Sequence, residues 1–234
     1  MNRKMVVFTI GKLLKVEALL LLLPCIVGVI YHEQAAIAYL VVAVFTFLVG
    51  TLLSWKKPKN QNIFAKEGFF IVGISWTLLS LFGALPFMLS GEIPSFTDAF
   101  FETVSGFTTT GSSILPTLSG ISQASLFWRS FTHWIGGMGI LVFTVAFIPI
   151  ASGRTMHILK AEMPGPIIGK LVSKVSVTAR ILYVIYTVLT LIQILLLMLG
   201  DMPIFDSILN SFATAGTGGF AMSDAGIAGY NSAY

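Results

Sequence analysis

The hydrophobic and polar positions divide this chain into long apolar segments joined by shorter polar connections. Five segments are long enough to cross a bilayer: about 13–31, 35–54, 67–90, 125–151 and 177–200. A helix rises about 1.5 Å per residue, so it needs about 20 residues to cross a hydrocarbon core of about 30 Å. The pattern therefore predicts five membrane-spanning helices and no large soluble domain.

Composition supports the membrane class. Hydrophobic residues make up 56% of the chain and charged residues 10%, and the mean hydropathy is +0.89. Soluble domains carry about 25% charged residues. We therefore expect an all-α polytopic membrane protein. The single Cys25 excludes an internal disulfide and is interpreted as a packing residue.

The basic residues predict the orientation. They precede the first apolar segment, and they gather between the second and third segments and between the fourth and fifth. Only Arg129 falls on the opposite side. Because cytoplasmic connections carry an excess of Lys and Arg, the N-terminus is expected to be cytoplasmic.

Acidic residues lean toward the outer side, and this permits two interpretations. Acids tolerate either side of a membrane, or they line an outer vestibule that concentrates cations. Sequence alone leaves both open. The residues are Glu33, Glu92, Asp98, Glu102, Asp201, Asp206 and Asp224.

The stretch between the third and fourth apolar segments is polar where the neighbouring segments are apolar. Apolar spacing predicts a helix over 96–107, with Ser95 or Thr97 as a cap and Asp98 in its first turn. At about 18 Å, this helix reaches about halfway across a bilayer. The Thr/Ser/Gly-rich run 108–113 then disfavours helix.

Extended backbone at membrane depth is tolerated only if protein, water or an ion satisfies its carbonyls. A half-helix also directs a partial negative charge, about −0.5, at its C-terminal end. Together these features resemble a potassium filter built from Thr and Gly carbonyls. The alternative is an ordinary outer loop with a short interfacial helix.

A second copy of the pattern follows the fifth apolar segment, at 202–220. Asp98 and Asp206 are 108 residues apart, as are Gly111 and Gly219. Pairing Thr110–Gly111 with Thr217–Gly218 instead requires a slip of one residue, and sequence leaves this register open. The internal repeat favours two re-entrant half-helices over two surface loops.

Six motifs also match a known family in order, over nearly the whole chain: Gly83–Phe87 (GALPF), Asp98–Glu102 (DAFFE), Gly106–Gly111 (GFTTTG), Trp134–Gly139 (WIGGMG), Ala161–Pro166 (AEMPGP) and Gly218–Phe220 (GGF). On these motifs the chain resembles the Trk/Ktr/HKT superfamily of potassium transporters, and most of all its bacterial TrkH type.

The resemblance implies a four-repeat, potassium-channel-like pore fold, with two extra spans before the repeats. On this interpretation residues 1–62 form the extra two-helix domain and 63–153 form pore repeat 1. Residues 154–234 form a cytoplasmic linker and a pore repeat 2 that lacks its outgoing helix. About five membrane helices and two re-entrant pore helices are expected.

The resemblance also implies a function and a site. The function is potassium uptake across the bacterial inner (cytoplasmic) membrane, with potassium as substrate and neither an organic cofactor nor an enzymatic activity. The filter would consist of backbone carbonyls, and potassium would bind at Thr109, Thr110, Thr217 and Gly218, with Gly111 as a further filter position.

The implied partners are the lipid membrane, a second copy of the full-length protein and a cytoplasmic nucleotide-binding regulatory subunit of the TrkA or KtrA type. The segment 152–176 is where that subunit would bind, and no nucleic-acid partner is expected. Family chains are about twice this length. The alternatives are therefore a fragment of a longer gene product, two chains that pair, or a non-transporting scaffold that only assembles with the regulatory ring.

Four further expectations concern the fourth apolar segment. Arg129 either extends to lipid headgroups or pairs with an acid such as Glu102. His133 is either a packed residue or a proton or metal site. Gly136, Gly137 and Gly139 allow either close helix packing or a hinge. A membrane enzyme that uses His133 and Glu102 is the least favoured interpretation.

Overall fold

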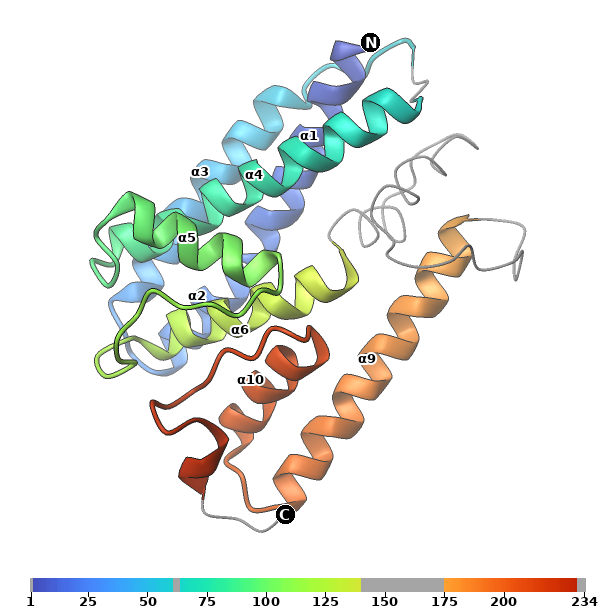
Figure 1. The fold of residues 1–234 in the computed structure, drawn as a ribbon. Coiled ribbons are helices and arrows are strands. Elements are labelled where there is room, and N and C mark those ends of the chain that lie inside the picture. Colours follow the sequence, from blue (N-terminus) through green and yellow to red (C-terminus); the bar gives the residue numbers. More distant parts are fainter. Residues whose placement is uncertain (1, 61–63, 140–174, 231–234) are drawn as a thin grey trace.

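The computed structural model describes residues 2–60, 64–139 and 175–230, and within these ranges the chain is helical with no strand (Figure 1). The α-helices are α1 (Arg3–Leu20), α2 (Leu22–Ile30), α3 (Ala35–Leu53), α4 (Ala65–Leu89), α5 (Phe96–Phe107), α6 (Gln123–Met138), α9 (Val175–Leu199) and α10 (Ile204–Ala215), followed by the short 3-10 helix η1 (Gly226–Tyr230).

Four stretches of the described chain are long and apolar enough to cross a membrane. They are Arg3–Ile30, Ala35–Leu53, Lys66–Leu89 and Ala179–Leu199. The prediction of a polytopic all-α membrane protein is confirmed. The fourth predicted span, 125–151, is described only as far as Gly139, and the predicted contact segment 152–176 lies almost wholly outside the described residues.

The helix that carries the first predicted span begins before that span, at Arg3 rather than near residue 13. The basic residues that were expected to precede the span therefore lie within the helix. The ammonium groups of Lys12 and Lys15 lie over the rings of Phe8 and Phe47, at 5.0 and 5.8 Å. The long side chains of Lys12 and Lys15 place each charge beside an aromatic face. Both lysines are therefore accommodated inside the helix.

The break between α1 and α2 falls at Leu21. Pro24 has no N–H to donate to the carbonyl four residues earlier, and its ring crowds that carbonyl. A proline therefore interrupts the helix one turn before its own position.

Helices α1, α3 and α4 run side by side (Figure 1). The closest approach is between α1 and α3, where a Cβ on Gly11 would lie 2.7 Å from the backbone nitrogen of Ser54 and 2.8 Å from the Gly50 carbonyl. Small residues permit backbones to pack at this distance, which is the usual way membrane helices associate.

Helix α6 occupies the centre of the described structure, between α5 on one side and α10 on the other (Figure 1). Its fully buried Trp128 donates a 2.9 Å hydrogen bond to the Gly83 carbonyl of α4 and packs edge-on against Phe107 of α5. The Tyr39 hydroxyl of α3 lies 3.0 Å from the Ser125 hydroxyl of α6. Helix α6 is thereby fixed to α3, α4 and α5.

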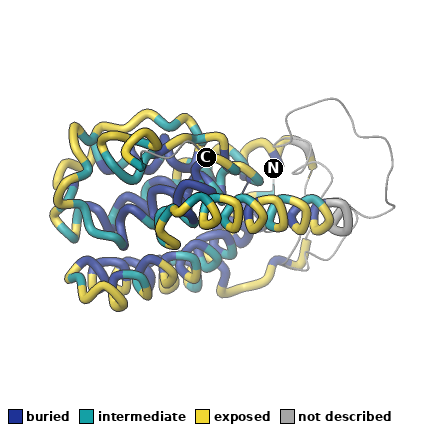
Figure 2. Tube along the Cα trace, turned by 90° about the horizontal axis from the view of Figure 1, so that it is seen from below, coloured by how far each residue is buried: buried dark blue, intermediate teal, exposed yellow. Residues whose placement is uncertain are grey.

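Exposed residues lie on the outer sides of the helices, and the buried ones gather where helices meet (Figure 2). Helix α9 differs from the other spans, because only 11% of its apolar window is buried. Its contact with α6 uses polar groups: the Trp134 indole donates to the Thr190 hydroxyl, and the Tyr186 hydroxyl donates to the Trp134 carbonyl, both at 3.1 Å.

The α1–α3 contact gives a first prediction. Gly11→Leu should lower the free energy of unfolding by about 1–3 kcal/mol, because the new side chain has no space between the two backbones. Gly73→Leu is the matched control, since a Cβ there meets no atom within 4 Å. Thermal unfolding in detergent compares the two variants. Equal melting temperatures for both would contradict the close packing.

Candidate ion-binding site

Helices α5 and α10 are two copies of one structural unit. Each has 12 residues, and their first and last residues are offset by 108. The turns that follow them make matching hydrogen bonds, from the Thr110 amide to the Ser105 carbonyl and from the Gly218 amide to the Ala213 carbonyl, at 3.0 and 2.9 Å. The helix predicted over 96–107 is confirmed, and the second copy has the same form.

Backbone conformation decides the register that the sequence left open. Thr109 and Thr217 both have positive φ, at 55° and 58°, and so do Gly111 and Gly219, at 75° and 87°. Each pair is 108 residues apart. The two loops therefore correspond without a slip, so Thr110 is equivalent to Gly218.

Two threonines in the left-handed region are unusual. A β-branched residue at positive φ is strained by about 1–3 kcal/mol, and such strain concentrates at functional sites. Both copies retain it at the same place, Thr109 and Thr217. The conformation of these loops is consequently held by the surrounding structure and not by local preference.

Helix α6 holds the ends of both short helices through adjacent glycines. A Cβ on Gly136 would collide with the Phe107 carbonyl at the end of α5, and one on Gly137 would lie 2.7 Å from the Cα of Gly216 at the end of α10. A Cβ on Gly111 would collide with the Gly218 carbonyl of the other loop. The two loops therefore meet, and the expected close packing at Gly136 and Gly137 is confirmed.

The structure brings all five predicted site residues to this meeting point. No described group donates a hydrogen bond to the carbonyls of Thr109, Thr110, Gly111 or Thr217. The Gly218 carbonyl is directed at Gly111. The side chains at Thr110 and Thr217 are exposed. This arrangement can supply unpaired main-chain oxygens beside the C-terminal ends of two helices.

The His133 imidazole packs behind the second loop. It is fully buried, it stacks on the Phe220 ring at 4.1 Å, and a Cβ on Gly218 would collide with it. Both ring nitrogens are buried. The structure thus favours the packed interpretation of His133, and within the described residues no three His, Cys, Asp or Glu side chains gather as a metal site.

A buried ion pair connects α5 to α6. The Nε of Arg129 lies 2.7 Å from the Glu102 carboxylate, and their side chains are 2% and 0% exposed. Glu102 also accepts hydrogen bonds from the Ser113 hydroxyl and the Ile114 amide, both at 2.9 Å. The guanidinium lies 4.3 Å from the centre of the Phe220 ring. The predicted Arg129–Glu102 pair is confirmed, and it also fixes the segment that leaves the first loop.

Most of the acidic residues that were predicted to lie on the outer side have structural roles. The carboxylate of Glu33 accepts hydrogen bonds from the first amides of α6, those of Gln123 and Ala124, at 2.7 and 3.1 Å. Glu92 accepts from the Ser122 amide at 3.0 Å. Carboxylates at a helix N-terminus satisfy free amides and favour the helix dipole. These two acids therefore fix the start of α6.

The segments after the two loops are tied by Asp224, which accepts hydrogen bonds from the Thr117 hydroxyl and the Leu118 amide at 2.6 and 2.8 Å. These bonds lower the pKa of the Asp224 carboxyl below its usual range. Asp206 likewise accepts from the Tyr230 hydroxyl at 2.7 Å. With Glu33, Glu92 and Glu102, these acids make internal contacts, so the structure gives the vestibule interpretation no support at these positions.

Comparison with known proteins identifies the family. One family model, described as TrkH, cation transport protein, matches residues 35–234. The chain belongs to the TrkH family.

Individual TrkH relatives agree. The chain is 40% identical over 216 residues to the Trk system potassium uptake protein TrkH of Salmonella typhimurium. The matched region covers 91% of this chain and 44% of the relative. It is 34% identical over 238 residues to the protein of the same name from Vibrio parahaemolyticus, over 100% of this chain and 49% of the relative. The resemblance to the TrkH type is confirmed.

A solved TrkH structure shares the fold. The crystal structure of the potassium transporter TrkH from Vibrio parahaemolyticus matches with a TM-score of 0.79 and 32% identity, over 96% of this chain and 45% of that chain. The chain spans about half the length of the curated relatives it matches. Those relatives are named as potassium uptake proteins.

The buried ion pair gives a second prediction. Glu102→Gln leaves the Arg129 guanidinium buried without its counter-charge, which should cost about 3–5 kcal/mol of unfolding free energy. The double variant Glu102→Gln/Arg129→Met should be more stable than the single variant, since it removes both charges. Asp98→Asn, on the same helix, is the control. Denaturant titration in detergent measures all three, and a double variant no more stable than the single one would argue against the pairing.

The Asp224 contact gives a third prediction, with a defined pH window. Because the folded pKa is lowered, the contact contributes stability above the ordinary carboxyl pKa of about 4 and loses it as pH falls through the lower folded value. Hydrogen exchange at the Leu118 amide should stay slow at neutral pH and become faster in Asp224→Ala. Asp201→Ala, at an exposed site, should leave it unchanged. An equal effect of both changes would exclude the contact.

Proposed function

We propose that this chain supplies half of a potassium-uptake pore in a bacterial inner membrane. The observation that carries the proposal is the repeated unit itself. Two helices of 12 residues, offset by 108, end against the same pair of glycines in α6 and continue into contacting loops of the same unusual conformation. The names of the relatives, which specify potassium uptake, support the identity of the ion.

Potassium would be held by the carbonyls of Thr109, Thr110 and Gly111 in the first loop and of Thr217 and Gly218 in the second. Carbonyl oxygens can replace the hydration shell of K⁺, and the negative ends of two helix dipoles favour a cation at this place. Unpaired oxygens in both loops support this assignment.

The Gly218 carbonyl requires one further step, because it is directed at Gly111 in this structure. For it to face the ion, the peptide between Gly218 and Gly219 must rotate. Gly219 permits this rotation, since it has φ 87° and open space around it. Gly111 allows the two loops to approach this closely, because a Cβ there would collide with the Gly218 carbonyl.

The pore fold would require both loops to enter the membrane from the outside. In the proposed orientation the N-terminus is cytoplasmic, as the distribution of Lys and Arg favours. The membrane potential would then drive K⁺ inward, with about 2.3 kcal/mol per charge per 100 mV.

A potassium filter takes carbonyls from four loops, and this chain contributes two. We therefore propose that residues 1–62 are an accessory pair of spans, that 63–153 are the first pore repeat and that 154–234 begin the second. The remaining loops would come from further chain or from a second copy. A cytoplasmic nucleotide-binding subunit and a homodimer of the longer protein are the partners that accompany this arrangement.

Rubidium uptake provides the functional test and the fourth prediction. The 234 residues, joined to the remainder of the Vibrio parahaemolyticus relative to complete four loops, should take up rubidium when reconstituted in vesicles. Gly111→Ala should abolish most of this uptake, because its Cβ would collide with the Gly218 carbonyl.

Gly120→Ala is the matched control. Gly120 also has positive φ, at 90°, but a Cβ there meets no atom within 4 Å. The Gly120→Ala variant has the same kind of backbone strain, but outside the two loops, and it should retain rubidium uptake. Inserted, folded protein without rubidium uptake would favour the non-transporting scaffold, and equal uptake by Gly111→Ala and Gly120→Ala would contradict the filter.

A further inference from the structure

A basic pocket lies at the end of the bundle where the chain begins, away from the two loops. It has a volume of about 910 Å³ and is formed by the first turn of α1, the end of α3 and the connection that follows α3. Five exposed cationic side chains line it: Arg3, Lys4, Lys56, Lys57 and Lys59. No acidic residue is among the lining residues.

The walls of this pocket are fixed by hydrogen bonds. The Asn2 side-chain amide donates to the Asn60 carbonyl at 2.8 Å, which joins the start of α1 to the end of the connection. The Glu67 carboxylate accepts from the backbone amides of Asn2 and Phe64 at 3.0 and 3.1 Å. Glu67 therefore holds the two helix starts together, and the backbone around the pocket is fixed by these bonds.

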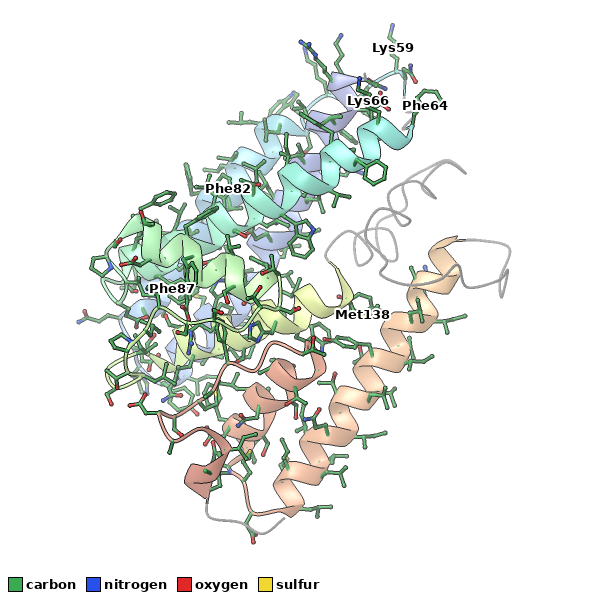
Figure 3. All side chains as sticks on the ribbon, in the orientation of Figure 1. Lys59, Phe64, Lys66, Phe82, Phe87 and Met138 are labelled. Carbon is green, nitrogen blue, oxygen red and sulfur yellow. The ribbon has the colours of Figure 1, made fainter. Side chains whose placement is uncertain are left out.

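The pocket lies where the apolar stretch of α3 ends, which is where we expect the edge of the membrane. Gly11 of α1 packs at the level of Gly50 and Ser54, where the apolar stretch of α3 ends. The first turns of α1 extend beyond that level. A pocket between these turns and the residues after Leu53 thus lies at the height of lipid headgroups. Figure 3 shows Lys59, one of the lining residues, at this end of the bundle.

The lining is apolar as well as cationic. Val7, Leu52 and Trp55 line the same pocket and are 43%, 71% and 73% exposed. Leu52 belongs to a helix whose exposed side is apolar along its length, so it continues a lipid-facing surface into the pocket. Trp is typical of the membrane interface because its ring is apolar and its N–H is polar.

We propose that this pocket binds the headgroup of an anionic phospholipid. The five cations would contact the phosphate, and Val7, Leu52 and Trp55 would contact the upper acyl chains. Basic pockets between membrane helices bind anionic headgroups in this way. A soluble phosphate would use the cations alone and would leave the apolar side without a ligand. The site is separate from the proposed pore and does not depend on ion transport.

Lipid titration of the 234-residue chain tests the proposal. The purified chain in detergent is titrated with phosphatidylglycerol, and with phosphatidylcholine of the same acyl chains, by native mass spectrometry. The triple variant Lys56→Gln/Lys57→Gln/Lys59→Gln should lose about tenfold or more in phosphatidylglycerol affinity. The matched control Lys12→Gln/Lys15→Gln/Lys66→Gln removes the same charge outside the pocket lining and should lose less than about twofold. Thermal unfolding verifies that both variants fold.

Competition separates a lipid from a soluble anion. Millimolar glycerol phosphate should fail to displace bound phosphatidylglycerol, because it lacks the acyl chains. Complete displacement would overturn the lipid assignment in favour of a soluble phosphate ligand. If both triple variants lost the same phosphatidylglycerol affinity, the lipid would be attracted by overall charge and not by this pocket. If phosphatidylcholine bound as tightly as phosphatidylglycerol, the pocket would recognise acyl chains and not an anionic headgroup. Each of these three results contradicts the proposal.

Discussion

The contact on which the described structure depends is the backbone-to-backbone packing of α6 against the ends of α5 and α10. Two adjacent glycines make it possible, Gly136 toward Phe107 and Gly137 toward Gly216. Any side chain at either position would separate α6 from one short helix. Because neighbouring residues on α6 face different partners, one helix sets the distance between both loops.

The surrounding contacts keep α6 in the position that this packing requires. Glu33 and Glu92 satisfy amides at its start, and Trp128 anchors its middle to α4. The buried pair between Arg129 and Glu102 connects it to α5. Buried charges are costly to leave unpaired, so this pair fixes the relative position of the two helices as well as joining them.

Local patterns predicted the elements well. Apolar spacing and a capping serine gave the bounds of α5 correctly, since a short amphipathic helix depends on its own residues. The internal repeat was also visible, because Asp98 and Asp206 mark the same turn of two similar units. The register of the loops was not readable, because it depends on the φ angles of Thr109 and Thr217, which the surrounding packing imposes.

Long-range contacts were the main part that the sequence could not supply. Glu33 was visible only as one acid among those on the outer side, yet it caps a helix 90 residues later. The hydroxyl of Ser113 was not recognised as a partner of Glu102, because nothing in the local pattern signals that the return segment folds back onto α5. The Arg129–Glu102 pair was one of the two alternatives that the sequence left open for Arg129, and the structure decides between them.

The most direct measurement of the central claim is anomalous scattering from rubidium in crystals of the completed four-loop protein. We expect a peak between the two loops, within about 3 Å of carbonyl oxygens of residues 109–111 and 217–218. Rubidium bound elsewhere, with these loops ordered and their carbonyls facing away from it, would contradict the claim that the loops form one cation site.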